Sequence, residues 1–124
     1  MDYHILIVDD SETQRELMRA VSESAGYRVT EAQNGKLAVE AAKQDPPNLV
    51  LLDLFMPEQD GIETLQELKK ATPELKIIAL SGFVRKGHSL LHAASLLGAN
   101  KTLLKPFEPQ HLLKAMAELL EGSP

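Results

Sequence analysis

Five short apolar segments alternate along the chain with longer segments in which apolar residues recur every three or four positions. The short segments cover residues 4–9, 27–31, 48–53, 76–81 and 101–105. Apolar runs of this length predict strands, whereas a repeat of three to four positions predicts helices. Three of the expected strands are continuously aliphatic, as is typical of parallel strands buried on both faces of a sheet. Residues 27–31 (YRVTE) are more polar and suit an edge strand.

The first expected helix has a capping signature at its start. Ser11 is followed three positions later by Gln14, so the serine hydroxyl can accept a hydrogen bond from a free backbone N–H. The helix is expected to run to about Ser24. Its apolar face is predicted to consist of Leu17, Met18, Val21 and Ala25.

The other helices are delimited by asparagine, glycine and proline. Proline disfavours helical geometry in the residue before it, so Pro46 and Pro47 place the end of the second helix shortly before them. The second helix is expected from residues 34–35 through 42, and the third begins near residue 61. The fourth presents Leu90, Leu91, Ala94 and Leu97 and stops at Gly98, and the last starts near Pro109 and presents Leu112, Leu113, Met116, Leu119 and Leu120.

This alternation predicts an α/β fold, with a parallel five-stranded sheet between two layers of helices. The polar second strand favours the strand order 2-1-3-4-5 of a flavodoxin-like (βα)5 three-layer sandwich. The length predicts a single domain over residues 1–124. In such sheets ligands bind beyond the carboxyl ends of the strands, so a site is expected there.

Polar residues end four of the five expected strands. They are Asp9 and Asp10, Asp53, Ser81 and Lys105. Singly, each could serve as a turn, a cap or a solvated charge. Together, the three carboxylates need a cation, and oxygen ligands favour a hard divalent ion such as Mg²⁺. A carboxylate beside Mg²⁺ and an ammonium group can attack phosphorus, and Asp53, which ends the central strand, is the expected nucleophile.

Composition and charge exclude several classes of function. The chain has no cysteine, which excludes disulfide and thiolate chemistry and favours a cytoplasmic location. No segment approaches the ~20 apolar residues that span a bilayer, and the N-terminus does not resemble a secretion signal. The formal net charge is −5 and the basic residues are scattered, so neither membrane insertion nor direct binding to nucleic acid is expected.

Four motifs resemble the receiver domains of bacterial two-component response regulators, over essentially the whole chain. They are DD at 9–10, DLFMPEQDG at 53–61, ALSG at 79–82 and LLKPF at 103–107. The resemblance implies a phosphoacceptor switch that takes a phosphoryl group from a sensor histidine kinase or a histidine phosphotransfer protein in a Mg²⁺-dependent reaction. It also implies altered binding of an unknown downstream protein, as a monomer or a phosphorylation-dependent dimer. Such a domain promotes only its own phosphorylation and dephosphorylation and is not otherwise an enzyme.

The same resemblance implies a role for each residue at the strand ends. Asp53 would be phosphorylated, with Asp10 a direct Mg²⁺ ligand and Asp9 assisting through water. Ser81 would donate a hydrogen bond to a phosphoryl oxygen, and Lys105 would form a salt bridge with it. A cis peptide bond before Pro106 is implied as well, and X–Pro bonds adopt the cis form at a cost of only about 0.5–1 kcal/mol.

Thr102 departs from the receiver pattern, which usually has tyrosine or phenylalanine three residues before the lysine. Signal readout therefore depends either on loop movement with Ser81 or on passing the phosphoryl group along a phosphorelay. Thr102 also keeps open a phosphorylation-independent adaptor that only retains the fold. A small phosphohydrolase with an aspartyl-phosphate intermediate is a further alternative, but haloacid-dehalogenase-like enzymes separate their two aspartates by one residue, whereas Asp9 and Asp10 are adjacent.

Overall fold

The five strands form one parallel sheet in the order β2-β1-β3-β4-β5, as the sequence predicts. The computed structural model describes residues 2–56, 61–82 and 84–122, with side chains described outside 84–89. The strands are β1 (His4–Val8), β2 (Arg28–Ala32), β3 (Leu49–Asp53), β4 (Lys76–Ser81) and β5 (Lys101–Leu104). The helices are α1 (Glu12–Ser24), α2 (Gly35–Gln44), α3 (Gly61–Ala71), α4 (Val84–Leu96) and α5 (Pro109–Ala117), and a π-helical turn, η1 (Glu118–Gly122), follows.

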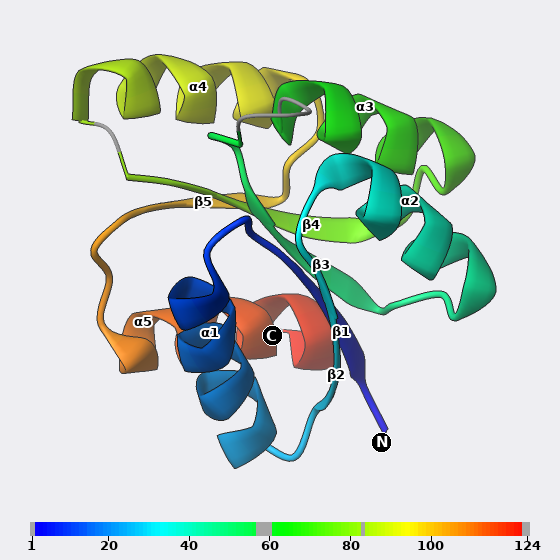
Figure 1. Ribbon diagram of the computed structural model, residues 1–124. Coiled ribbons are helices and arrows are strands. Elements are labelled where there is room, and N and C mark those ends of the chain that lie inside the picture. The colour runs from blue at the N-terminus through cyan, green and yellow to red at the C-terminus, as the bar shows by residue number, and fades with distance from the viewer. Residues whose placement is uncertain (1, 57–60, 83, 123–124) are drawn as a thin grey trace.

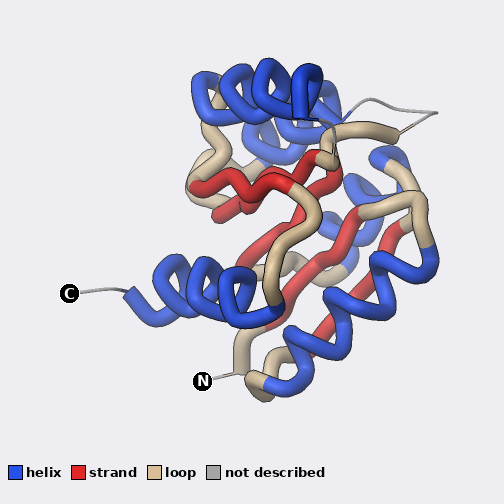
Figure 2. Tube along the Cα trace, turned by 90° about the vertical axis from the view of Figure 1, so that its left-hand side faces the viewer, coloured by secondary structure: helices blue, strands red, loops and turns tan. Residues whose placement is uncertain are grey.

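Helices cover both faces of the sheet, with α1 and α5 on one side and α2, α3 and α4 on the other (Figures 1 and 2). Successive residues of β1 point to opposite faces: Ile5 and Ile7 pack with α1 and α5, whereas Leu6 and Val8 pack with the other three helices. All residues of β1 and β3 are buried, which confirms the interpretation of their aliphatic runs. This arrangement is the flavodoxin-like fold.

The polar strand β2 lies at the edge of the sheet, as expected, and each strand boundary agrees with the sequence to within one residue. Tyr27, expected as the first residue of this strand, lies just before it and is buried. Its ring packs edge-on against Tyr3, with the ring centroids 5.9 Å apart. Among the described residues, no helix has the length and apolar character needed to cross a membrane.

The apolar faces of two helices differ from the prediction. Leu17, expected in the core, is 43% exposed. The buried face of α1 instead includes Ser22, whose hydroxyl donates to the backbone oxygen of Met18 at 2.8 Å and is thereby satisfied within the core. Ala25 is the C-cap of α1 and is exposed, and Leu97 lies just beyond α4 and is also exposed. A helical repeat alone does not reveal where the neighbouring elements end, so residues at the margin of a stripe are easily misassigned.

Two of the expected helix starts are capped by their own side chains. The Ser11 hydroxyl accepts a hydrogen bond from Gln14 N at 3.2 Å, which confirms the capping interaction inferred from the sequence. The Asn34 side chain accepts from Leu37 N at 2.9 Å and starts α2 in the same way. The cap of α1 matters for function because it fixes the chain directly after the two adjacent aspartates.

Gly61 starts α3 in close contact with the end of β3. Its N–H donates to Leu54 O at 3.1 Å. A Cβ atom at this position would lie 2.4 Å from Leu54 Cα and 2.7 Å from Asp53 O, well inside van der Waals contact with the backbone. Only glycine therefore allows α3 to begin against the segment that carries Asp53.

We expect Gly61→Ala to lower the free energy of unfolding by about 2–4 kcal/mol, because the added methyl group must displace backbone rather than a flexible side chain. Urea denaturation measures the effect. Gly26→Ala is the matched control, since Gly26 has φ +85° but open space where a Cβ would lie, and strain alone should cost about 1–2 kcal/mol. Equal losses in the two variants would show that the contact at Gly61 is readily relieved.

Candidate functional site

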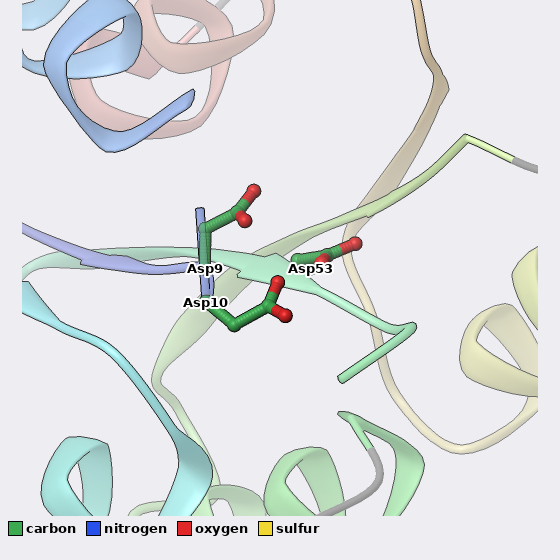
Figure 3. Close-up of side chains that lie close together, drawn as sticks. All are labelled: Asp9, Asp10 and Asp53. Carbon is green, nitrogen blue, oxygen red and sulfur yellow. The ribbon is translucent and has the colours of Figure 1, made fainter. Parts of the chain in front are cut away.

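Three carboxylates meet at the carboxyl ends of β1 and β3. Asp9 and Asp10 follow β1, Asp53 ends β3, and one oxygen from each lies within 4.8 Å of the others (Figure 3). The strands are parallel neighbours, so their carboxyl ends reach the same edge of the sheet. Asp9 and Asp53 are only 1% and 5% exposed, whereas Asp10 is open to solvent. The cluster is therefore anchored inside and accessible from one side.

Lys105 relieves the repulsion within this cluster. Its Nζ lies 2.7 Å from Asp9 Oδ2 and 3.6 Å from Asp53 Oδ1, and its side chain is only 16% exposed. The other oxygen of Asp9, Oδ1, accepts a hydrogen bond from Ser11 N at 2.9 Å. The ammonium group thus lies between two buried carboxylates. Its attraction to them is screened less than it would be at the surface.

The backbone of Asp9 makes two hydrogen bonds in addition to those of its side chain. Its N–H donates to Ala32 O on β2 at 3.2 Å. Its carbonyl oxygen accepts from Nη1 of Arg15 at 2.8 Å. Arg15 is a residue of the site that the sequence reasoning missed. The weak signal in the sequence is a cation close to the N-terminus of a helix, where the helix dipole favours acidic residues.

Ser81 ends β4 at the same edge of the sheet. Its backbone oxygen accepts from Lys105 N at 2.7 Å, which joins β4 to the segment after β5. The peptide bond from Lys105 to Pro106 is cis, as the resemblance to receivers implies. Ser81 is fully buried, and among the described residues its Oγ has no hydrogen-bond partner. Buried polar groups are normally paired, so this hydroxyl is well suited to bind an oxygen of a ligand.

Burial raises the pKa of Asp53 to about 6. The positive charge of Lys105 opposes this rise, whereas the charge of Asp9 adds to it, and the hydrogen bond from Phe55 N, 3.4 Å from Asp53 Oδ1, opposes it. Burial therefore destabilises the carboxylate form of Asp53, and a bound cation would stabilise that form.

In the absence of metal, we expect Asp53 to make the protein less stable as the pH rises from about 4 to about 6. Its pKa is 3.8 as a free group and about 6 in the folded protein. Its contribution to the free energy of unfolding is therefore fully present below pH 3.8 and is lost as the pH rises through 6. The loss is about 3 kcal/mol. Urea denaturation with EDTA, on wild type and Asp53→Asn from pH 4 to 8, isolates the effect of this group. Parallel pH profiles for the two proteins would contradict the prediction.

The donor set fits a hard divalent cation. Asp9, Asp10 and Asp53 offer carboxylate oxygens, the ligand type that Mg²⁺ prefers. The exposure of Asp10 leaves room for the waters that Mg²⁺ retains.

All five residues predicted from the strand ends lie at one edge of the sheet. Thr102, the departure from the receiver pattern, is half-buried on β5 in register with Ala79 of β4.

Known proteins that resemble this chain include response regulator receiver domains. The family model of the response regulator receiver domain matches residues 5–117. The chain is 36% identical to the chemotaxis protein CheY of Thermotoga maritima over 117 residues, covering 94% of this chain and 96% of that protein. It is also 36% identical to CheY of Bacillus subtilis over 121 residues, covering 97% of this chain and 99% of that protein.

Solved structures give the same picture. The CheY-like receiver domain protein of Methanospirillum hungatei superimposes with a TM-score of 0.91 at 27% identity, covering 98% of this chain and 95% of that one. The receiver domain of NtrX from Brucella abortus superimposes with a TM-score of 0.90 at 30% identity, covering 96% of this chain and 99% of that one.

Proposed function

Because the chain belongs to the family of response regulator receiver domains, we propose that it is a phosphoacceptor switch of a two-component system or phosphorelay. In this proposal Asp53 accepts a phosphoryl group from a sensor histidine kinase or a histidine phosphotransfer protein. The observation that carries it is the buried Asp53 carboxylate, placed among two further carboxylates, the Lys105 ammonium and the unpartnered hydroxyl of Ser81. One domain over residues 1–124 and a location in the cytoplasm belong to the same proposal.

Each residue has a distinct role in the proposed reaction. An oxygen of Asp53 forms a bond to phosphorus as the bond from phosphorus to the donor histidine nitrogen breaks, and the electron pair of that bond stays on the imidazole. Asp9, Asp10 and Asp53 would hold Mg²⁺. When bound, Mg²⁺ supplies neutralisation of the charge on the phosphoryl oxygens.

Lys105 and Ser81 complete the site from the neighbouring strands. The Lys105 ammonium, 3.6 Å from Asp53 Oδ1, is placed to neutralise a phosphoryl oxygen on that carboxylate. The Ser81 hydroxyl donates a hydrogen bond to another phosphoryl oxygen and so gains the partner that it lacks. The phosphorylated form then binds a different protein partner, as a monomer or a dimer, and the chain acts on no substrate other than itself.

Intact-protein mass spectrometry with acetyl phosphate tests the proposal. We expect one phosphoryl adduct that requires Mg²⁺, is absent with EDTA and is lost in hydroxylamine, since acyl phosphates react with this nucleophile. Borohydride reduction and peptide mapping should place the adduct on Asp53. If neither acetyl phosphate nor a phosphorylated histidine phosphotransfer protein labels the chain, and beryllofluoride with Mg²⁺ does not bind, the proposal fails and the adaptor function that Thr102 keeps open replaces it.

A further inference from the structure

Arg15 connects the first acidic residue of the site to the edge strand β2. Its Nη1 donates to the carbonyl oxygen of Asp9 at 2.8 Å, and its Nε donates to Glu31 Oε1 at 2.9 Å. The Arg15 side chain is mostly buried, at 14% exposure. The two donors belong to one planar guanidinium group, so the carbonyl of Asp9 is held at a fixed distance and direction from Glu31.

The bound carbonyl belongs to the peptide group that joins Asp9 to Asp10. A peptide group is planar, so holding its oxygen fixes the orientation of the whole unit, including the nitrogen of Asp10. Asp10 is exposed, so packing does not hold its carboxylate beside that of Asp53. The direction in which Asp10 leaves the strand therefore depends on its backbone, which Arg15 holds on one side and the Ser11 cap of α1 on the other.

A second arginine distinguishes this contact from general reinforcement of α1 and β2. Arg19 also binds Glu31, with Nε 2.6 Å from Oε2, and pairs with Glu23 at 2.9 Å. Within the described part of the chain, its side-chain hydrogen bonds go to these two glutamates and not to Asp9. The two arginines lower the pKa of Glu31, mainly through their hydrogen bonds. Glu31 is thus bound by two arginines, and of these two only Arg15 also contacts a residue of the acidic cluster.

We infer that Arg15 is a positioning residue for the cation site: by holding the peptide group between Asp9 and Asp10, it keeps the Asp10 carboxylate beside that of Asp53. The inference rests on the proposed function, in which these carboxylates bind Mg²⁺. It makes a prediction opposite in sign to that of simple electrostatics. Removing a positive charge near an anionic site should strengthen cation binding through space, whereas loss of the positioning contact should weaken it.

Direct metal binding decides between these two signs. Mn²⁺ serves as the probe, since binding removes the electron paramagnetic resonance signal of the aqueous ion, and Mg²⁺ is measured by competition. We expect Arg15→Ala to bind both ions about 10-fold more weakly than wild type, in line with other residues that orient metal ligands. Arg15→Lys keeps the charge but not the paired donors, and it should also bind more weakly. Arg19→Ala is the matched control and should stay within about twofold of wild type, because it loses a similar ion pair without touching Asp9.

Unchanged or tighter binding in both Arg15 variants would overturn the inference and leave Arg15 as a tether between α1 and β2. Equal weakening in Arg15→Ala and Arg19→Ala would overturn it too, by showing that affinity follows the general stability of α1. If Arg15→Ala proves unfolded by circular dichroism, the affinity of Arg15→Lys alone decides whether the contact positions the site. The proposed metal site itself would be refuted if the wild-type protein bound no Mn²⁺, or if Asp10→Asn bound Mn²⁺ as tightly as wild type.

Discussion

Asp53→Asn is expected to abolish phosphoryl labelling by acetyl phosphate and Mg²⁺. The amide has almost the shape of the carboxylate but is not a nucleophile toward phosphorus, so the acyl phosphate cannot form. The neighbouring carboxylates are poor substitutes. Asp9 is 1% exposed and is already bound by Lys105 and Ser11 N, and Asp10 is the expected metal ligand. Intact mass after incubation should show less than about 1% of the wild-type adduct, a loss of the size seen when a nucleophile is removed.

A control variant separates loss of the nucleophile from loss of a charge. Asp45→Asn makes the same chemical change at an exposed carboxylate that pairs with Arg28, just after α2 and away from the acidic cluster. It should label like wild type. An adduct on Asp53→Asn at a substantial fraction of the wild-type level would show that another residue accepts the phosphoryl group.

The second large effect is expected for Lys105→Met. Without metal, this change leaves the buried Asp9 carboxylate beside Asp53 with no ammonium group between them, and we expect the free energy of unfolding at pH 7.5 to fall by about 3 kcal/mol. Methionine keeps much of the length and apolar volume of the lysine stem, so the loss reports the charge. In the proposed metal site Mg²⁺ is held by the same carboxylates, so saturating Mg²⁺ should recover most of the stability.

Lys101→Met is the matched control for this prediction. Lys101 pairs with Glu118 at 2.7 Å, but its side chain is 33% exposed, so the change should cost less than about 1 kcal/mol and should not depend on Mg²⁺. Urea denaturation with EDTA and with Mg²⁺ measures both variants. Equal losses, or a loss in Lys105→Met that Mg²⁺ leaves unchanged, would show that Lys105 and the metal do not act on the same carboxylates.

The phosphorylation and stability experiments examine different properties of one site. Lys105 is bound to Asp9 in this structure, at 2.7 Å, and is farther from Asp53, at 3.6 Å. In the proposed phosphorylated form the same ammonium group pairs with a phosphoryl oxygen on Asp53. A cation bound by Asp9 would supply the positive charge that Lys105 then no longer provides there. Metal binding and the transfer of Lys105 toward Asp53 are therefore expected to favour each other.

The sequence by itself determined the architecture and five residues of the candidate site, but not Arg15. Continuous aliphatic runs distinguish buried parallel strands such as β1 and β3, and the polar run identifies the edge strand β2. A strand buried on both faces needs apolar residues at every position, whereas a partly exposed edge strand does not, so the local pattern of residues separates the two. Parallel strands present their carboxyl ends at one edge. The residues that end the strands, among them Asp53, Ser81 and Lys105, could therefore be assigned to one site without coordinates.

Only the tertiary structure decided how those residues pair and which of them are buried. Asp9 and Asp10 are adjacent and chemically identical, yet one is enclosed and the other is open to solvent. The partner of Lys105 is Asp9, 96 positions away in the chain. Arg15 reaches the site through a backbone carbonyl, a contact for which the sequence holds only a weak signal. Such contacts depend on distances between elements that are remote in the chain, and a periodic pattern of residues records only which face of its own element each side chain occupies.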